Sequence, residues 1–235
     1  MSCVTMGIFI FAVLFETYAT ANGVKLDPTK NEPNYGIWVE EYFSVFGDVF
    51  FPDDGTSSSF RFGMTHVWFA PNSEAQDVAA SVLGTSENTN TINKYPGIGL
   101  ALGALSVAAY QLPGNLRAYS LGLGTVPRTK NTPVILRFAY TMVEDGEDFN
   151  VHVLNGEILT SMVDAAIEPY LGLGAQIGRG TYEPSGSDTQ DYIHSWTQGY
   201  ALAGLRFSLG PFGLATQVRG NPGRRQLSLH AYLHF

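Results

Sequence analysis

The 235-residue chain is acidic, with a formal net charge of −8, and it is rich in glycine and aromatic residues, with 26 Gly, 12 Tyr and 15 Phe. A nucleic-acid partner is disfavoured, because binding to phosphates needs a basic face. No stretch after residue 21 supplies the roughly 20 continuous apolar residues that a membrane-spanning helix requires. A search for long apolar stretches does not detect the strands of a membrane barrel, because half of their residues face the lumen.

The N-terminal residues have the pattern of a secretory signal peptide. Residues 7–15 are apolar, and Ala19-Thr20-Ala21 supplies a small-residue cleavage site. We therefore expect residues 1–21 to be a signal peptide, although no Lys or Arg precedes its apolar core. The only cysteine, Cys3, lies within this segment, so the exported chain is expected to be stable without disulfides.

The rest of the chain divides into a polar arm and a series of expected strands. Residues 22–35 are predicted to be a flexible N-terminal arm, and residues 36–235 a single β-barrel domain. A short helix is expected over 73–83 and a loop over 86–93. Strands are expected from alternation over 37–45, 59–69, 96–110, 117–125, 134–142, 168–178, 200–207, 212–219 and 226–235.

The number of strands depends on residues 151–164. Asn155-Gly156 is compatible with a hairpin turn or with a bulge inside one strand. If this segment contains a strand, the total is ten, which we favour. Eight strands result if this segment and one early strand lie outside the barrel, and bacterial single-chain barrels have even counts.

The final ten residues, QLSLHAYLHF, alternate without interruption. Polar residues occupy one face of this strand, and the other face carries Leu227, Leu229, Ala231, Leu233 and Phe235. This ending resembles the terminal-Phe assembly signal of bacterial outer-membrane β-barrel proteins. The string PYLGLGAQIG over 169–178 is similar to a strand of small opacity-type surface barrels. The resemblance implies a closed antiparallel transmembrane β-barrel of eight to ten strands in the bacterial outer membrane. It also implies contact with outer-membrane lipids and lipopolysaccharide, and with the barrel-assembly machinery during biogenesis.

Two soluble folds use the same alternation. A β-sandwich and a lipocalin-like barrel both bury an apolar face in the interior. The membrane barrel is favoured by the signal peptide, the terminal Phe, the glycine-rich polar face and the short turns that alternate with longer loops.

In a narrow lumen, buried charges must be paired or hydrated. Glu168 and Arg206 lie on the polar faces of two expected neighbouring strands, near the same end, and we expect them to pair. The same polar faces should extend this pair into a lumen network with Arg137, Gln217, Arg219 and Gln226.

No residue pattern identifies an enzyme, a cofactor or a metal ion. His230 and His234 would lie about 13 Å apart on one strand, too far to share a metal ion. The acidic stretch 144–148 lacks the register of a calcium loop. His194-Ser195 could belong to a lipid hydrolase with Asp188 or Asp191, but the His-x-Ser-Asn string of a lipid A deacylase is absent.

We therefore expect a non-enzymatic protein with a structural or surface-interaction role. The alternatives are a narrow porin-like channel, a lipid-modifying enzyme and a secreted soluble binding protein. The sequence identifies no specific ligand or host partner and no oligomeric state, because one barrel scaffold hosts many functions.

Overall fold

The computed structural model describes residues 35–46, 60–83, 93–112, 116–124, 134–145, 148–161, 167–183, 191–221 and 224–235. Within these ranges the chain forms two helices, α3 (Tyr35–Phe43) and α4 (Ser73–Leu83). It also forms ten strands: β1 (Phe60–Phe69), β2 (Asn93–Leu102), β3 (Leu105–Gln111), β4 (Arg117–Gly124), β5 (Val134–Glu144), β6 (Phe149–Ser161), β7 (Ile167–Tyr182), β8 (Tyr192–Leu209), β9 (Phe212–Asn221) and β10 (Arg224–His234).

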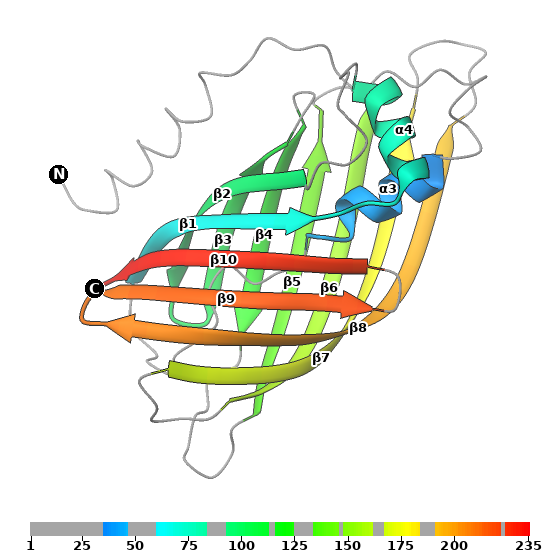
Figure 1. Ribbon diagram of the computed structural model, residues 1–235. Coiled ribbons are helices and arrows are strands. Elements are labelled where there is room, and N and C mark those ends of the chain that lie inside the picture. Colours follow the sequence, from blue (N-terminus) through cyan, green and yellow to red (C-terminus); the bar gives the residue numbers. More distant parts are fainter. Residues whose placement is uncertain are drawn as a thin grey trace, which may run out of the picture.

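The ten strands form one closed barrel in which every strand is antiparallel to both of its neighbours (Figure 1). Chain order is kept around the wall, and β1 closes the ring by pairing with β10. At this seam the backbones of Phe60 and Phe235 exchange two hydrogen bonds, of 3.3 and 2.9 Å. Closure satisfies the backbone groups of what would otherwise be two edge strands. The predicted closed antiparallel barrel, with the favoured count of ten strands, is confirmed.

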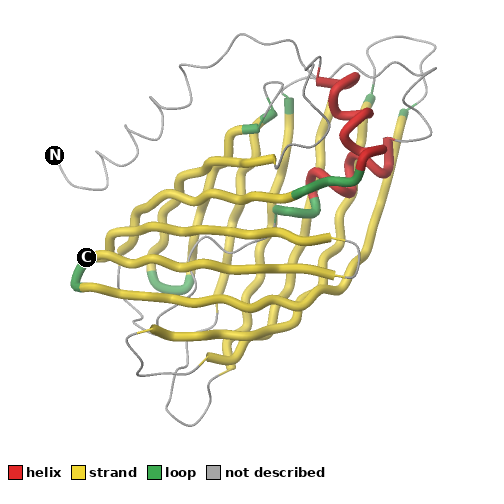
Figure 2. The backbone as a smooth tube through the Cα atoms, in the orientation of Figure 1, coloured by secondary structure: helices red, strands yellow, loops and turns green. Residues whose placement is uncertain are grey.

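The two ends of the barrel differ. At the end that we call the terminal end, β1 begins and β10 finishes, and two connections there are tight turns at residues 103–104 and 210–211. At the opposite end, the loop end, the longest connection runs from Phe69 to Asn93 and contains α4. Both helices lie at the loop end, where Figure 2 shows them in red beside the ends of the yellow strands.

The outward face of the wall is apolar. Strand β5 shows the alternation most simply, because its residues are exposed and buried in turn from Val134 to Thr141. Exposed large side chains on the wall include Leu121, Leu136, Phe138, Leu154, Ile158, Leu171, Leu173, Ile177, Leu205, Leu214, Val218 and Leu227. A continuous apolar surface of this kind is stable only against hydrocarbon or a protein partner.

The inward face is mixed: aromatic and aliphatic side chains such as Tyr95, Tyr110, Val151 and Val153 are buried there, and polar and charged side chains are buried among them. The buried side chains of the wall include Arg61, Thr65, Ser106, Ser120, Arg137, Thr141, Asn155, Glu157, Gln176, Gln217, Ser228 and His230. Soluble β-sandwiches and lipocalin-like barrels bury their apolar face in the interior and expose a polar one. This wall instead exposes its large apolar side chains and encloses ion pairs. The distribution of polarity therefore favours the transmembrane barrel over both soluble alternatives. Among the described residues, no helix is long and apolar enough to cross a membrane.

The strand predicted over 37–45 is wrong, because most of this segment is helix α3. Trp38, Val39, Tyr42 and Phe43 are all buried, and their spacing is that of one helical face. The sequence alternates like a strand because Ile37 and Val45 complete the apolar pattern. Both also pack in the core, although neither lies on this helical face.

Residues 96–110, predicted as a single strand, belong to two strands, β2 and β3. The tight turn between them uses Gly103, whose positive φ of 57° favours glycine. The strand lost at 37–45 is thus replaced by the one gained here, so the predicted count of ten strands is right although two of its members were assigned wrongly.

Of the uncertain segment 151–164, residues 151–161 belong to one strand, and residues 162–164 lie outside the described residues. Strand β6 passes straight through Asn155 and Gly156, which pair with Ala139 and Phe138 of β5. The predicted helix over 73–83 is confirmed as α4. Of the predicted loop over 86–93, Asn93 is the first residue of β2 and the remainder lies outside the described residues. The predicted signal peptide and residues 22–34 of the predicted arm also lie outside them.

Candidate functional site: the filled lumen

A buried carboxylate lies in the middle of the lumen. Glu157 of β6 is only 5% exposed. Its Oε2 atom forms an ion pair with Arg137 Nη2 at 2.6 Å, and its Oε1 atom accepts a hydrogen bond from the Tyr200 hydroxyl at 2.9 Å. Arg137 also donates to Gln217 Oε1 at 2.9 Å. The carboxylate therefore links strands β5, β6 and β8 across the interior.

A second arginine completes this central network. The guanidinium carbon of Arg219 lies 3.6 Å from the centre of the Tyr200 ring, a cation–π contact. Arg219 also donates to Asn155 Oδ1 at 3.4 Å, and Asn155 in turn donates to Glu157. Charges removed from water are tolerated only when paired and hydrogen-bonded. The network thus fills the lumen with groups that depend on one another.

A second ion pair lies nearer the terminal end. Glu168 and Arg206 are register partners on β7 and β8, and Arg206 Nη2 contacts Glu168 Oε2. The other members of the predicted lumen network are all buried inside the wall. Gln226 donates instead to Ser228 of its own strand, β10, at 3.2 Å. The structure thus brings Arg137 and Gln217 together, and Glu168 and Arg206 together, as two separate groups.

Sequence reasoning missed Glu157, the residue that organises the centre. The reason is that the segment 151–164 was left open between a hairpin and a strand. If the alternation is continued through Gly156, then Val151, Val153, Asn155 and Glu157 share the inward face. That parity was the available signal.

Helix α3 fills the lumen at the loop end. Trp38 is fully buried, with its ring 5.4 Å from that of Phe43 and 5.4 Å from that of Phe149 on β6. Phe46, just beyond the helix, stacks on Tyr95 of β2 with 5.2 Å between ring centres. Aromatic pairs at these separations add to the free energy gained from burying the rings. The helix is thus packed as a plug within the wall.

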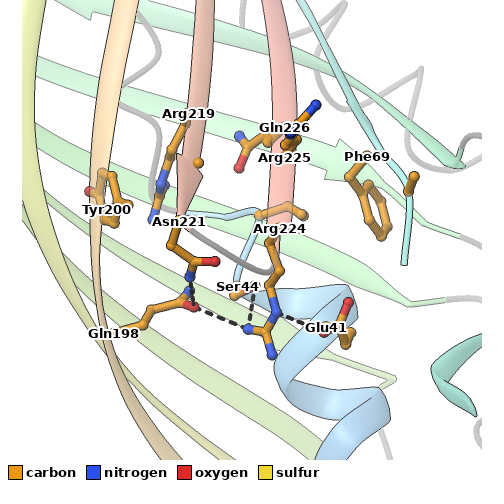
Figure 3. Close-up of a pocket in the computed structure, with 13 residues that line it drawn as sticks. Glu41, Ser44, Phe69, Gln198, Tyr200, Arg219, Asn221, Arg224, Arg225 and Gln226 are labelled. Atoms are coloured by element: carbon orange, nitrogen blue, oxygen red, sulfur yellow. Dashed lines mark hydrogen bonds and ion pairs between the residues drawn. The ribbon is translucent and has the colours of Figure 1, made fainter. Parts of the chain in front are cut away.

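Polar contacts fix the plug at defined points (Figure 3). Figure 3 shows Arg224, at the loop end of β10, paired with Glu41, at 2.7 Å. Arg224 also pairs with Glu40, at 2.9 Å. The buried Gln176 amide of β7 donates to two main-chain oxygens of the plug, Ser44 at 3.0 Å and Phe46 at 2.6 Å. Main-chain carbonyls beyond a helix end are unsatisfied without such donors. The contacts join the plug to strands β7 and β10.

One glycine permits close approach of the plug to the wall. A Cβ atom on Gly36 would lie 2.5 Å from Nδ1 of His194 on β8. The imidazole Nε2 atom of His194 lies 3.4 Å from Glu40 of the same helix. A side chain at position 36 would therefore force the His194 imidazole or the helix to move.

A small pocket remains between the plug and strands β8 to β10. Its walls include Glu41, Gln198, Asn221 and Arg224, and their hydrogen bonds are drawn in Figure 3. The pocket volume of about 30 Å³ has room for roughly two water molecules. It is too small for an organic solute.

The structure separates the two residues considered for hydrolysis. His194 lies on the inward face of β8 beside Glu40, whereas Ser195 is exposed on the outward face. Neighbouring strand residues point to opposite faces, so these two cannot act as a nucleophile and its base. In the described part of the chain, no three His, Cys, Asp or Glu side chains come together as a metal site. Of the acidic stretch, Asp145 accepts a hydrogen bond from the Phe149 amide at 3.1 Å and so stabilises a turn.

The residues of the expected assembly signal lie on the outward side of β10. Leu227, Ala231 and Phe235 are exposed, Leu229 and Leu233 are partly exposed, and the Phe235 ring lies 6.3 Å from that of Phe60.

An apolar outer wall, a lumen that encloses ion pairs and a closed ring of antiparallel strands define a transmembrane β-barrel. No family model and no curated protein matches the sequence. Among solved structures, the chain is similar to small bacterial outer-membrane barrels. Neisserial surface protein A is 13% identical with a TM-score of 0.35, covering 76% of this chain and 96% of that one. The N-terminal β-barrel domain of Pseudomonas aeruginosa OprF is 13% identical with a TM-score of 0.34, covering 77% and 99%. Acinetobacter baumannii Omp33 is 9% identical with a TM-score of 0.35, covering 77% and 100%.

Proposed function

We propose that the protein is an integral barrel of the bacterial outer membrane with a structural or surface-interaction role, and that it is not an enzyme. The observation that carries this proposal is the combination of an apolar outer wall with a lumen that side chains fill in two places. The central network of Glu157, Arg137, Arg219 and Tyr200 fills the middle, and α3 fills the loop end. Barrels of this size are usually packed inside and do not conduct.

The orientation follows from the loops. Outer-membrane barrels have short periplasmic turns and longer extracellular loops. The terminal end has the tight turns at 103–104 and 210–211, and the loop end has the long connection with α4. We therefore assign the loop end to the outside of the cell.

Lipopolysaccharide is the proposed lipid partner at the outer leaflet. On the outward faces of the described strands, every Lys or Arg lies near the loop end: Lys94, Arg117, Arg179 and Arg225. Lys94 lies beside Trp68 of β1 in register, and Arg225 lies two residues from Leu227, the partner of Trp68 on β10. Two cations thus flank an aromatic side chain at one boundary of the apolar wall. Cations attract anionic headgroups, and tryptophan prefers the interface of a membrane.

Replacing Lys94 and Arg225 together with glutamine is expected to weaken binding of the purified protein to lipopolysaccharide roughly tenfold to thirtyfold. Each cation near an anionic lipid surface contributes about 1 kcal/mol. Fluorescence titration of detergent-purified protein with labelled lipopolysaccharide measures the change. Arg224→Gln is the matched control, because Arg224 lies on the inward face and should leave this affinity unchanged. Equal losses in both variants would refute an outward lipid site.

The barrel-assembly machinery is the proposed partner during biogenesis. The outward positions of Leu227, Leu229, Ala231, Leu233 and Phe235 support this proposal, because an assembly factor that receives the last strand would meet this face.

The protein is expected to remain with the outer-membrane fraction and to migrate differently on a gel with and without boiling, because the closed hydrogen-bonded wall resists detergent. Reconstituted into planar bilayers, it is expected to show no conductance steps above the bare bilayer, since both the network and the plug obstruct the lumen. The same purified sample serves both measurements.

Reproducible conductance steps would overturn the closed lumen and favour the narrow porin-like channel. Recovery without detergent, with no mobility shift on boiling, would overturn the membrane assignment and favour a secreted binding protein.

A further inference from the structure

Arg219 is a buried cation that has no carboxylate partner among the described residues. It is only 4% exposed, and its guanidinium lies on the Tyr200 ring. Its Nη2 atom donates to Asn155 at 3.4 Å, whereas its Nη1 atom is buried and forms no hydrogen bond within the described part of the chain. By contrast, Arg137 and Arg206 each form an ion pair with a glutamate. A buried charge without a counter-charge is costly, so the position of Arg219 favours a bound anion.

Arg219 lines the small pocket between the plug and strands β8 to β10, where Figure 3 draws it with the other lining residues. Side-chain acceptors of this pocket are already engaged. Gln198 Oε1 accepts from Asn221 at 3.1 Å and from Arg224 at 3.0 Å. Glu41 accepts from Arg224 through Oε1 at 2.7 Å, and from a main-chain amide through Oε2 at 3.4 Å. The carboxylate of the pocket therefore already compensates another arginine.

The donors of the pocket are more numerous than these contacts use. A glutamine amide nitrogen carries two hydrogens. Gln198 uses one of them to donate to Gln176 at 2.6 Å, and Gln226 uses one to donate to Ser228 at 3.2 Å. The second hydrogens of these two amides and the Nη1 atom of Arg219 belong to residues that line the same pocket. A ligand that complements them accepts hydrogen bonds and carries negative charge.

We propose that this pocket binds one small monovalent anion, of the size of chloride, against the Arg219 guanidinium. The pocket volume of about 30 Å³ sets the size, because a halide ion takes little more space than a water molecule and a tetrahedral oxyanion needs more. One negative charge balances Arg219, whereas a second would itself be uncompensated in the lumen. The site lies inside the barrel, so the proposal does not depend on which side of the membrane the loop end faces.

A bound anion would join the plug to the wall. Glu41, Ser44 and Val45 form one side of the pocket, and residues of β8, β9 and β10 form the other. A ligand that binds only the folded state stabilises that state by mass action. The stability of the barrel should therefore rise with the concentration of chloride, and not with that of an anion too large for the pocket.

Urea unfolding in lipid vesicles tests this dependence by comparing sodium chloride with sodium gluconate at the same concentration. Gluconate keeps the ionic strength equal but is too large for the pocket. At about 100 mM chloride, a site with a Kd of about 10 mM lowers the unfolding equilibrium constant about tenfold. Equal stability in the two salts would overturn the proposal.

Arg219→Gln removes the cation and is expected to abolish the difference between the two salts, whatever its effect on stability in gluconate. The matched control is Arg117→Gln, because Arg117 is exposed on the outward face of β4 and should leave the tenfold difference unchanged. A chloride effect that persists in Arg219→Gln, or that disappears in Arg117→Gln, would place the anion elsewhere and overturn the proposal.

A second measurement uses the unaltered chain and holds even if Arg219→Gln fails to fold. Crystals grown in sodium bromide are expected to show an anomalous scattering peak within hydrogen-bond distance of the Arg219 guanidinium. Ordered water alone in the pocket would overturn the proposal. A bromide peak without any chloride effect on stability would be binding at crystal concentration only, and would overturn it as well.

Discussion

Replacing Glu157 with alanine is expected to destabilise the folded barrel by about 3–5 kcal/mol, the range found when one partner of a buried ion pair is removed. The loss has a specific cause: Arg137 would lose its ion pair, at 2.6 Å, and the Tyr200 hydroxyl its acceptor, at 2.9 Å. The change in unfolding free energy is measured by urea unfolding in lipid vesicles. The folded fraction at each urea concentration is read from the band that keeps the mobility of the folded barrel when samples are not boiled before electrophoresis.

Two variants separate this network from a general loss of packing. The double replacement Glu157→Leu with Arg137→Met removes both charges together, so it should recover much of the stability lost by Glu157→Ala. Glu144→Gln, a carboxylate at the loop-end rim of β5, should change the unfolding free energy little. If the double variant is less stable than Glu157→Ala, the stability lost by Glu157→Ala does not come from leaving the buried Arg137 charge without its ion pair.

Replacing Leu173 with arginine is expected to cost about 2–4 kcal/mol, because a cation near the middle of the hydrocarbon layer must be desolvated. Leu173 lies near the middle of β7, points outward and is 63% exposed, so no protein group shields it. Folding into lipid vesicles, monitored by the mobility shift on boiling, gives the unfolding free energy from urea titration.

The matched control is Leu209→Arg, at the terminal end of β8, where the side chain is 66% exposed. Near the interface the same charge should cost only about 0–1 kcal/mol. Equal costs at the two positions would contradict a hydrocarbon layer around the middle of the wall. Together, the Glu157 and Leu173 variants test the inner and outer faces of two neighbouring strands, β6 and β7.

The two faces also explain why the closed lumen and the membrane assignment belong together. The outward residues of β5, β6 and β7 gain stability from lipid, so the interior is free to be polar. A polar interior in turn requires its charges to be compensated, which Glu157 does for Arg137 and Glu168 does for Arg206. Structural integrity of the barrel thus depends on the same side chains that occupy the lumen.

The sequence by itself determined the features that depend on local alternation. In β5, β7 and β10, one face of the strand meets an apolar medium and the other a polar one. Apolar and polar residues therefore alternate along the sequence with a period of two. The inward positions of Arg137, Glu168, Arg206 and Gln217 follow from it. The closed antiparallel barrel was implied by the resemblance of the last strand to those of outer-membrane barrels, because alternation alone also fits soluble folds.

Only the tertiary structure decided what fills the interior. Residues 37–45 alternate well enough to predict a strand, yet they form most of α3, because their partners lie far away in the chain. Gln176, which holds the main chain after this helix, is 132 residues from Ser44, and Arg224 is 183 residues from Glu41. The role of Glu157 likewise depends on Arg137 and Tyr200, which lie on other strands. Alternation reports which medium a side chain faces; it carries no information about which distant side chain shares that medium.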